Sequence, residues 1–197
     1  MKKLLHVGCG TDYKKSLKGF NNSFWSETRL DIDKNVQPDI VGSLTDMSLV
    51  DSRSVDALFS SHNIEHIFPH EVPTALREFN RVLSDDGFVV ITCPDLVSVC
   101  KAVVNDRLME PLYSSDAGPI SPIDILYGYR EFIEQGKIYM AHKTGFTYTS
   151  LLKAFQEAGF KSFIGGSRPK TFDLFLIAFK QNRTEEDLKK ASAEFLP

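Results

Sequence analysis

The stretch that decides the fold is Leu5-His6-Val7-Gly8-Cys9-Gly10-Thr11, close to the start of the 197-residue chain. Its apolar run ends in two closely spaced glycines, which is typical of a buried strand that turns sharply at its carboxyl end. In doubly wound α/β folds, ligands bind at that edge of the sheet, where glycines let them approach the backbone amides. We therefore expect the glycine turn, from Val7 to Gly10, to line a ligand site.

A carboxylate follows where such a fold binds a ribose. Asp31 comes directly after the predicted strand 27–30 and about 20 residues after Gly10, the usual separation of a glycine loop from a ribose-binding acid. The alternative is that Asp31 only caps a solvated turn. The loop lacks the third glycine of a dinucleotide fingerprint and has no clear phosphate cradle, so adenosine without a pyrophosphate fits it better.

The rest of the chain alternates short apolar runs with helical periodicity. This pattern predicts an α/β fold, a largely parallel sheet with helices on both faces. The expected strands are 3–7, 27–30, 39–41, 55–60 and 88–93, then an antiparallel hairpin of 161–164 and 174–180 after a helix at 149–158. Residues 11–22 form a poor helix, so the first crossover is short, and Asp85-Asp86-Gly87 predicts a turn.

The length and composition predict one domain, 1–181, followed by a charged tail, 182–197, in which Leu188, Ala191 and Phe195 form one apolar stripe. We expect that tail to be loosely docked or partly disordered. The net charge of -3 comes without a basic cluster, and no apolar run reaches the roughly 20 residues of a membrane span. We therefore expect a cytoplasmic protein with a small-molecule partner, without nucleic-acid binding or a membrane span.

In their order, these segments resemble the class I S-adenosylmethionine-dependent methyltransferase family, from Lys3 to about Lys180. The matching segments are Leu5-His6-Val7-Gly8-Cys9-Gly10, Leu30-Asp31-Ile32-Asp33, residues 54–61, Asn63-Ile64-Glu65-His66-Ile67, residues 78–88 and Ala158-Gly159-Phe160. The sequence departs from the family at His6, which replaces its usual acid, at Asp12, which replaces its third glycine, and at Ser43, which stands where an acid often meets the adenine.

The resemblance implies a Rossmann-like, doubly wound sheet of seven strands, mostly parallel, with the last strand antiparallel. It also implies S-adenosylmethionine across the ends of the first, second and fourth strands, and an enzyme that methylates an unidentified, small-molecule acceptor. The cofactor-binding residues expected are Val7, Gly8, Cys9, Gly10, Asp31, Ile32, Ser43, Leu44, Thr45, Ser60, Ser61 and His62. The alternatives are a non-catalytic S-adenosylmethionine-binding or regulatory protein of this fold and, third, an NAD(P)-dependent oxidoreductase.

The segment His62-Asn63-Ile64-Glu65-His66 matches the H-x-x-E-H pattern of inverted zinc peptidases. That pattern needs a continuous helix and a further ligand, but here it directly follows a buried strand, and Pro69 interrupts the helical run. We therefore expect no metal. Glu65 and His66, with His142, are instead candidate catalytic residues that orient an acceptor or take its proton; the alternative for Glu65 and His66 is a structural role.

Residues 95–142 interrupt the regular pattern and are too long for a mere connection. This insertion is rich in aromatic residues, and we expect it to form an acceptor-binding lid through Tyr113, Tyr127, Tyr129 and Tyr139. The alternative is a helical flap whose aromatic side chains only cover the sheet.

Overall fold

The computed structural model describes residues 1–115 and 117–196, and over these residues the main sheet has seven strands in the order β3-β2-β1-β4-β5-β9-β8. Asp116 of the insertion and Pro197 of the tail lie outside the described residues. The strands are β1 (Lys2–Val7), β2 (Trp25–Asp31), β3 (Ile40–Val41), β4 (Val55–Ser61), β5 (Leu83–Pro94), β8 (Ser162–Arg168) and β9 (Asp173–Phe179).

The first five strands pair in parallel, and β9, the last in sequence, runs antiparallel to both β5 and β8. This confirms the expected Rossmann-like sheet and its late hairpin. The crossover from β1 to β2 contains only the short 3-10 helix η1 (Lys14–Ser16), as the poor helical pattern of residues 11–22 indicated.

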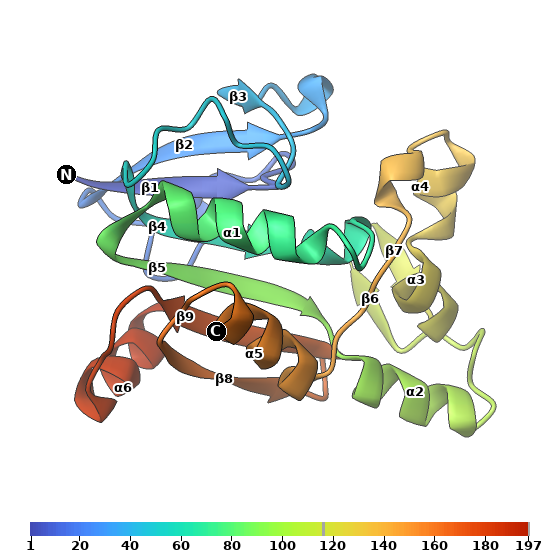
Figure 1. Ribbon diagram of the computed structural model, residues 1–197. Helices are drawn as coiled ribbons and strands as arrows, with labels where there is room; N and C mark the ends of the chain where they lie inside the picture. The colour runs from blue at the N-terminus through green and yellow to red at the C-terminus, as the bar shows by residue number, and fades with distance from the viewer. Residues whose placement is uncertain (116, 197) are drawn as a thin grey trace.

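Helices cover both faces of the sheet (Figure 1). Successive residues of a strand point to opposite faces, so neighbouring residues pack against different helices. Leu5 packs in the core with α1 (Val72–Val82) and α5 (Tyr148–Glu157), whereas Leu4 packs in a second core cluster with Phe195 of α6 (Glu185–Phe195). In α1, the buried side chains recur at helical spacing, which turns one face of the helix to the sheet (Figure 1).

The tail is not loosely docked, and that expectation was wrong. Its apolar stripe becomes one face of α6, and Phe195 and Leu196 are only 8% and 5% exposed. Phe195 contacts the rings of Phe20, Trp25 and Phe88, so the tail completes the second core cluster.

The expected turn at Asp85-Asp86-Gly87 was also wrong, because these residues lie within β5. Pairing with β4 shifts from Val55 opposite Leu83 to Ala57 opposite Phe88. Between these two pairs, β5 has more residues than β4, so residues 84–87 form an irregularity within β5 instead of a turn before it.

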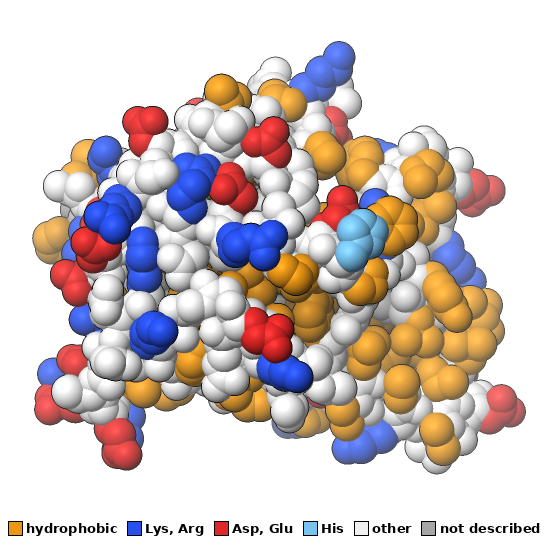
Figure 2. Space-filling view, in the orientation of Figure 1, with side chains coloured by type: hydrophobic (Ala, Val, Ile, Leu, Met, Phe, Trp, Pro, Cys, Tyr) orange, Lys and Arg blue, Asp and Glu red, His pale blue; other side chains and the backbone are white. Residues whose placement is uncertain are grey.

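The insertion lies at the carboxyl ends of the parallel strands, between β5 and α5 (Figure 1). Its elements are α2 (Leu96–Val104), the hairpin of β6 (Tyr113–Ser115) and β7 (Gly118–Ile120), α3 (Pro122–Tyr127), α4 (Arg130–Glu134) and the 3-10 helix η4 (Ile138–Met140). Hydrophobic side chains gather on the surface over α3, β6 and β7 (Figure 2). Among the described residues, no helix has the length and apolar character needed to span a membrane.

Candidate functional site

The glycine turn after β1 has the backbone that the sequence predicted. Gly8 has a φ of +66°, and a Cβ there would lie 2.3 Å from Nδ2 of Asn63, so this position requires glycine. A Cβ on Gly10 would meet nothing within 4 Å, which leaves the end of the turn open to a ligand.

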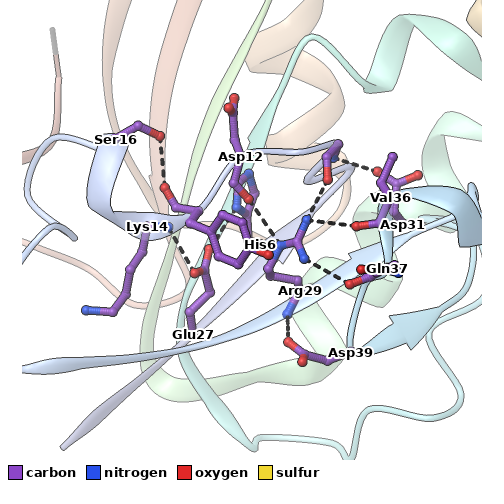
Figure 3. Close-up of polar contacts among 12 residues, drawn as sticks. His6, Asp12, Lys14, Ser16, Glu27, Arg29, Asp31, Val36, Gln37 and Asp39 are labelled. Atoms are coloured by element: carbon purple, nitrogen blue, oxygen red, sulfur yellow. Dashed lines mark hydrogen bonds and ion pairs between the residues drawn. The ribbon is translucent and has the colours of Figure 1, made fainter.

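Arg29 of β2 holds the turn in place, and sequence reasoning missed it. Its guanidinium is buried and donates hydrogen bonds to the carbonyls of Gly10 (2.6 Å), Asp12 (3.1 Å) and Gln37 (3.0 Å), with a longer bond to Val36 (Figure 3). The last two carbonyls belong to the loop after β2, around the 3-10 helix η2 (Lys34–Val36). One buried cation thus fastens together the two loops that border the site.

Asp31 ends β2 and is only 8% exposed. The amide of Gly10 donates to its Oδ2 and the amide of Asp33 to its Oδ1, both at 2.8 Å. Because a carboxylate can accept about four hydrogen bonds, each oxygen keeps a free lone pair. The backbone therefore orients the carboxylate without using up its capacity to bind two hydroxyls.

His6, which stands where the family has an acid, faces away from this turn toward β2. Its Nδ1 lies 3.0 Å from Oε1 of Glu27 (Figure 3), and its ring packs edge-on against Phe59. Burial lowers the pKa of His6, although Glu27 opposes the shift. The neutral ring is then part of the packing behind the site.

A cleft of about 430 Å³ lies beside the glycine turn. The predicted cofactor residues that line it are Val7, Gly8, Gly10, Asp31, Ile32, Ser43, Leu44, Thr45 and His62. The other three predicted residues, Cys9, Ser60 and Ser61, do not line the cleft. Cys9 and Ser60 are buried, and the hydroxyl of Ser61 is hydrogen-bonded to that of Thr92. Lining residues that sequence reasoning did not assign include Asn63, Lys137 and Lys143.

A second cavity, of about 260 Å³, adjoins the cleft under the insertion. Both hollows are lined by His62, His66, Phe132 and Met140, so these side chains form the boundary between them. A ligand in the cleft and a second molecule in the cavity would meet at this boundary.

The four tyrosines predicted for the lid have different positions. Tyr113 and Tyr129 line the second cavity. Tyr139 lines the cleft instead, and its hydroxyl donates to Oδ2 of Asp33 at 2.8 Å. Tyr127 is 64% exposed and is not among the residues that line either hollow of the described chain.

The bond between Tyr139 and Asp33 ties the insertion to the loop that follows the ribose-type acid. Burial, together with this bond, raises the pKa of Tyr139 to about 12, so the phenol keeps its proton. One hydrogen bond thus joins the insertion to the loop after β2.

The predicted catalytic residues meet in the second cavity, which Glu65, His66 and His142 all line. Glu65 and His66 belong to the 3-10 helix η3 (Ile64–His66), not to a continuous helix. His142 comes from the end of the insertion, where the chain packs so closely that a Cβ on Gly128 would lie 2.3 Å from the carbonyl of Met140.

The charges of this cluster are coupled. Burial disfavours a charge on Glu65, but the neighbouring histidines, His62 first, hold the pKa of its carboxyl below the usual value. For His62, burial is likewise outweighed by Asp173 and Glu65, which raise its pKa to about 9. Burial lowers the pKa of His142, so that ring is neutral at neutral pH. The cavity thus contains an ionised carboxylate beside an uncharged imidazole.

Comparison with protein families gives one match, a methyltransferase domain over residues 5–91. Comparison with curated proteins finds no match. Among solved structures, a possible histamine N-methyltransferase from Thermotoga maritima is 13% identical, with a TM-score of 0.52, over 92% of this chain and 83% of that one.

Two further structures are similar. The 1,6-didemethyltoxoflavin-N1-methyltransferase from Burkholderia thailandensis, solved with 1,6-didemethyltoxoflavin and S-adenosylhomocysteine, is 15% identical over 91% of this chain and 71% of that one, with a TM-score of 0.55. The citrinin polyketide synthase CMeT domain is 14% identical, with a TM-score of 0.56; the match covers 92% of this chain but only 47% of that one.

At these identities, structural similarity shows the fold. The family match, over residues 5–91, contains the glycine turn and Asp31, and it extends from within β1 to within β5. Residues 5–91 thus match a methyltransferase domain, and the whole chain has the fold of S-adenosylmethionine-dependent methyltransferases, in agreement with the class I resemblance of the sequence.

Proposed function

We propose that the protein transfers a methyl group from S-adenosylmethionine, bound in the 430 Å³ cleft, to a small molecule bound in the adjoining 260 Å³ cavity. The methyltransferase domain matched over residues 5–91 implies S-adenosylmethionine as the cofactor, and one similar structure contains its product, S-adenosylhomocysteine. The observation that carries the proposal is the shared boundary of the two hollows, at His62 and His66.

The cleft suits the cofactor by residue type. The free lone pairs of Asp31 suit the two ribose hydroxyls, and the open end of the turn at Gly10 leaves room for the ligand. Ser43, Leu44 and Thr45 would border the adenine, while Lys137 and Lys143 offer positive charge for the carboxylate of the methionine portion.

When bound, S-adenosylmethionine supplies a methyl group on a sulfonium; the lone pair of the acceptor forms the new bond, and the carbon–sulfur pair stays on sulfur. The chain has to hold the acceptor in line and keep water out. Tyr113, Tyr129 and Phe132 form the apolar part of the cavity, which suits this exclusion. Glu65, His66 and His142 are the groups placed to orient the acceptor or take its proton.

The size of the cavity supports a small acceptor. A volume of about 260 Å³ lies just below the range of roughly 300–1,000 Å³ for small-molecule sites, and α3, α4 and the β6–β7 hairpin enclose it. The chain carries a net charge of -3. A long anionic polymer is therefore a poor match for this site.

Calorimetric titration with S-adenosylhomocysteine tests the cofactor site. Asp31→Asn should weaken binding about 10- to 100-fold, because the amide cannot accept both ribose hydroxyls as a carboxylate does. Asp12→Asn is the matched control, since Asp12 belongs to the same loop but its side chain is exposed and does not line the cleft.

Equal affinities of both variants and of the wild-type protein would contradict the assignment of Asp31. Tighter binding of a nicotinamide dinucleotide than of S-adenosylhomocysteine would favour the oxidoreductase instead. Transfer of labelled methyl groups to a pool of metabolites then separates an enzyme from a non-catalytic binding protein of the same fold.

A further inference from the structure

Glu65 is a buried carboxylate that lacks a hydrogen-bond partner. Its residue is 1% exposed, and neither Oε1 nor Oε2 makes a hydrogen bond to any described residue. Buried polar groups are normally paired, and an unpaired ionised one is costly. Its backbone, in contrast, is well fixed, since the carbonyl accepts from the amides of Lys143 (2.8 Å) and Thr144 (3.2 Å). The position of Glu65 is thus fixed by its backbone, while its carboxylate is left without a hydrogen-bond partner among the described residues.

The nearest cation does not fully meet this need. Nδ1 of His62 lies 3.5 Å from Oε1 of Glu65, and Nε2 of the same ring lies 3.8 Å from Asp173. One half-exposed ring is therefore shared between two carboxylates at ion-pair distances that are too long for good hydrogen bonds. The second oxygen of Glu65 has no such neighbour among the described residues.

Two histidines beside Glu65 each contact a backbone carbonyl through Nδ1. Nδ1 of His142 lies 2.7 Å from the carbonyl of Ile125, and Nδ1 of His66 lies 3.3 Å from the carbonyl of Ala141. A carbonyl only accepts, so in each ring Nδ1 carries the proton and Nε2 keeps its lone pair. Metal-binding histidines are oriented in this way, by donating from the other ring nitrogen to a carbonyl.

The three side chains are close enough to share one ion. One ligand atom from each of Glu65, His66 and His142 lies within 4.8 Å of the others, and the two rings have centroids 4.8 Å apart. Bonds of about 2.1 Å in tetrahedral geometry place ligand atoms roughly 3.4 Å apart, so the side chains would move together by up to about 1.4 Å to bind one ion.

We propose that Glu65, His66 and His142 bind a divalent transition-metal ion, of the kind typified by zinc, at the wall of the second cavity. Two imidazoles and one carboxylate suit zinc, iron(II) or cobalt(II), whereas magnesium and calcium prefer oxygen ligands. The expectation of a metal-free site considered His62 and His66 on one helix; this set instead brings in His142 from the insertion.

The ion would face the cavity with open coordination positions. An acceptor bound there through oxygen or nitrogen would lose its proton more readily, because a bound metal lowers the pKa of its ligands. This connection with methyl transfer rests on the proposed function, whereas metal binding itself does not. Glu65, His66 and His142 would then act as ligands rather than as proton acceptors.

The test uses tag-free, full-length protein that has been stripped with a chelator and titrated with cobalt(II), followed by calorimetry and visible absorption. We expect saturable binding of one ion, displaced by zinc. Glu65→Gln and His142→Ala should each weaken it at least about tenfold. His70→Ala, which removes an exposed histidine stacked on Phe68, is the matched control and should leave it unchanged.

Titration with S-adenosylhomocysteine shows separately whether each variant is folded and whether the cofactor site works. A wild-type protein that binds S-adenosylhomocysteine but shows no saturable cobalt binding would overturn the metal site. Cobalt binding that survives both Glu65→Gln and His142→Ala would overturn it equally. Cobalt binding without affinity for S-adenosylhomocysteine would support the metal site and contradict the proposed function.

Discussion

The two hollows of this protein differ in how completely their polar groups are paired. On the cleft side, the Arg29 guanidinium bonds to loop carbonyls, and the Asp31 carboxylate accepts two backbone amides. On the cavity side, the carboxylate of Glu65 is as deeply buried but has no hydrogen bond from the described residues. The polar groups of the cleft are thus paired within the protein, whereas the cavity contains a buried carboxylate without a hydrogen-bond partner among the described residues.

Arg29→Met should have the largest effect, because it removes the cation that joins the two loops of the cleft. Several carbonyls lose their donor at once, so we expect a loss of about 3 kcal/mol in the free energy of unfolding. Urea denaturation measures it. Arg77→Met, at an exposed position of α1, is the control and should stay within about 0.5 kcal/mol. Equal stabilities of the two variants would mean that the cleft is not held together by Arg29.

Tyr129→Ala should have an intermediate effect, confined to the cavity side. Tyr129 lines the cavity and its hydroxyl donates to the carbonyl of Ala117 at 2.8 Å, so its loss should lower kcat/KM for an identified acceptor about tenfold. Affinity for S-adenosylhomocysteine should stay within about threefold, a difference of roughly 0.65 kcal/mol.

Tyr127→Ala is the matched control for Tyr129, since Tyr127 lies two positions earlier in the chain but is 64% exposed. It should leave both measurements unchanged. If the two variants lose acceptor use equally, the cavity is not the acceptor site. If Tyr129→Ala weakens cofactor and acceptor to the same degree, the two hollows do not work as separate sites.

His6→Asn should have the smallest effect, one that depends on pH. Burial lowers the pKa of His6 below 6.5, so in acid the unfolded chain takes up a proton that the folded protein does not. The stability that the neutral ring confers is fully present above pH 6.5, the pKa in the unfolded chain, and is lost as the pH falls toward the lower pKa of the folded protein. The difference in Tm between wild type and His6→Asn should therefore narrow from pH 7 toward pH 5; a constant difference would contradict a neutral, buried His6.

Much of the cleft could be predicted from the sequence because its signals are local. A glycine turn after an apolar run, and an acid at the end of the next strand, are short patterns that the backbone of this fold reproduces at Gly8, Gly10 and Asp31. No local sequence pattern indicates the role of Arg29, because its hydrogen bonds depend on where the carbonyls of two separate loops lie in the folded chain.

The cavity side was harder to predict because it depends on the path of the insertion. Nothing local shows that His142 returns beside His66, or that Tyr129 faces inward while Tyr127 faces solvent. The tail shows the same limit: its charged composition indicated loose docking, yet three apolar positions were enough to bury Phe195 in the core.

The most direct test of the account is a crystal structure with S-adenosylhomocysteine. The account predicts the ligand in the cleft, with both ribose hydroxyls within hydrogen-bonding distance of the Asp31 carboxylate and the sulfur directed to the boundary at His62 and His66. A ligand that lies elsewhere, or whose sulfur is directed away from the second cavity, would contradict it.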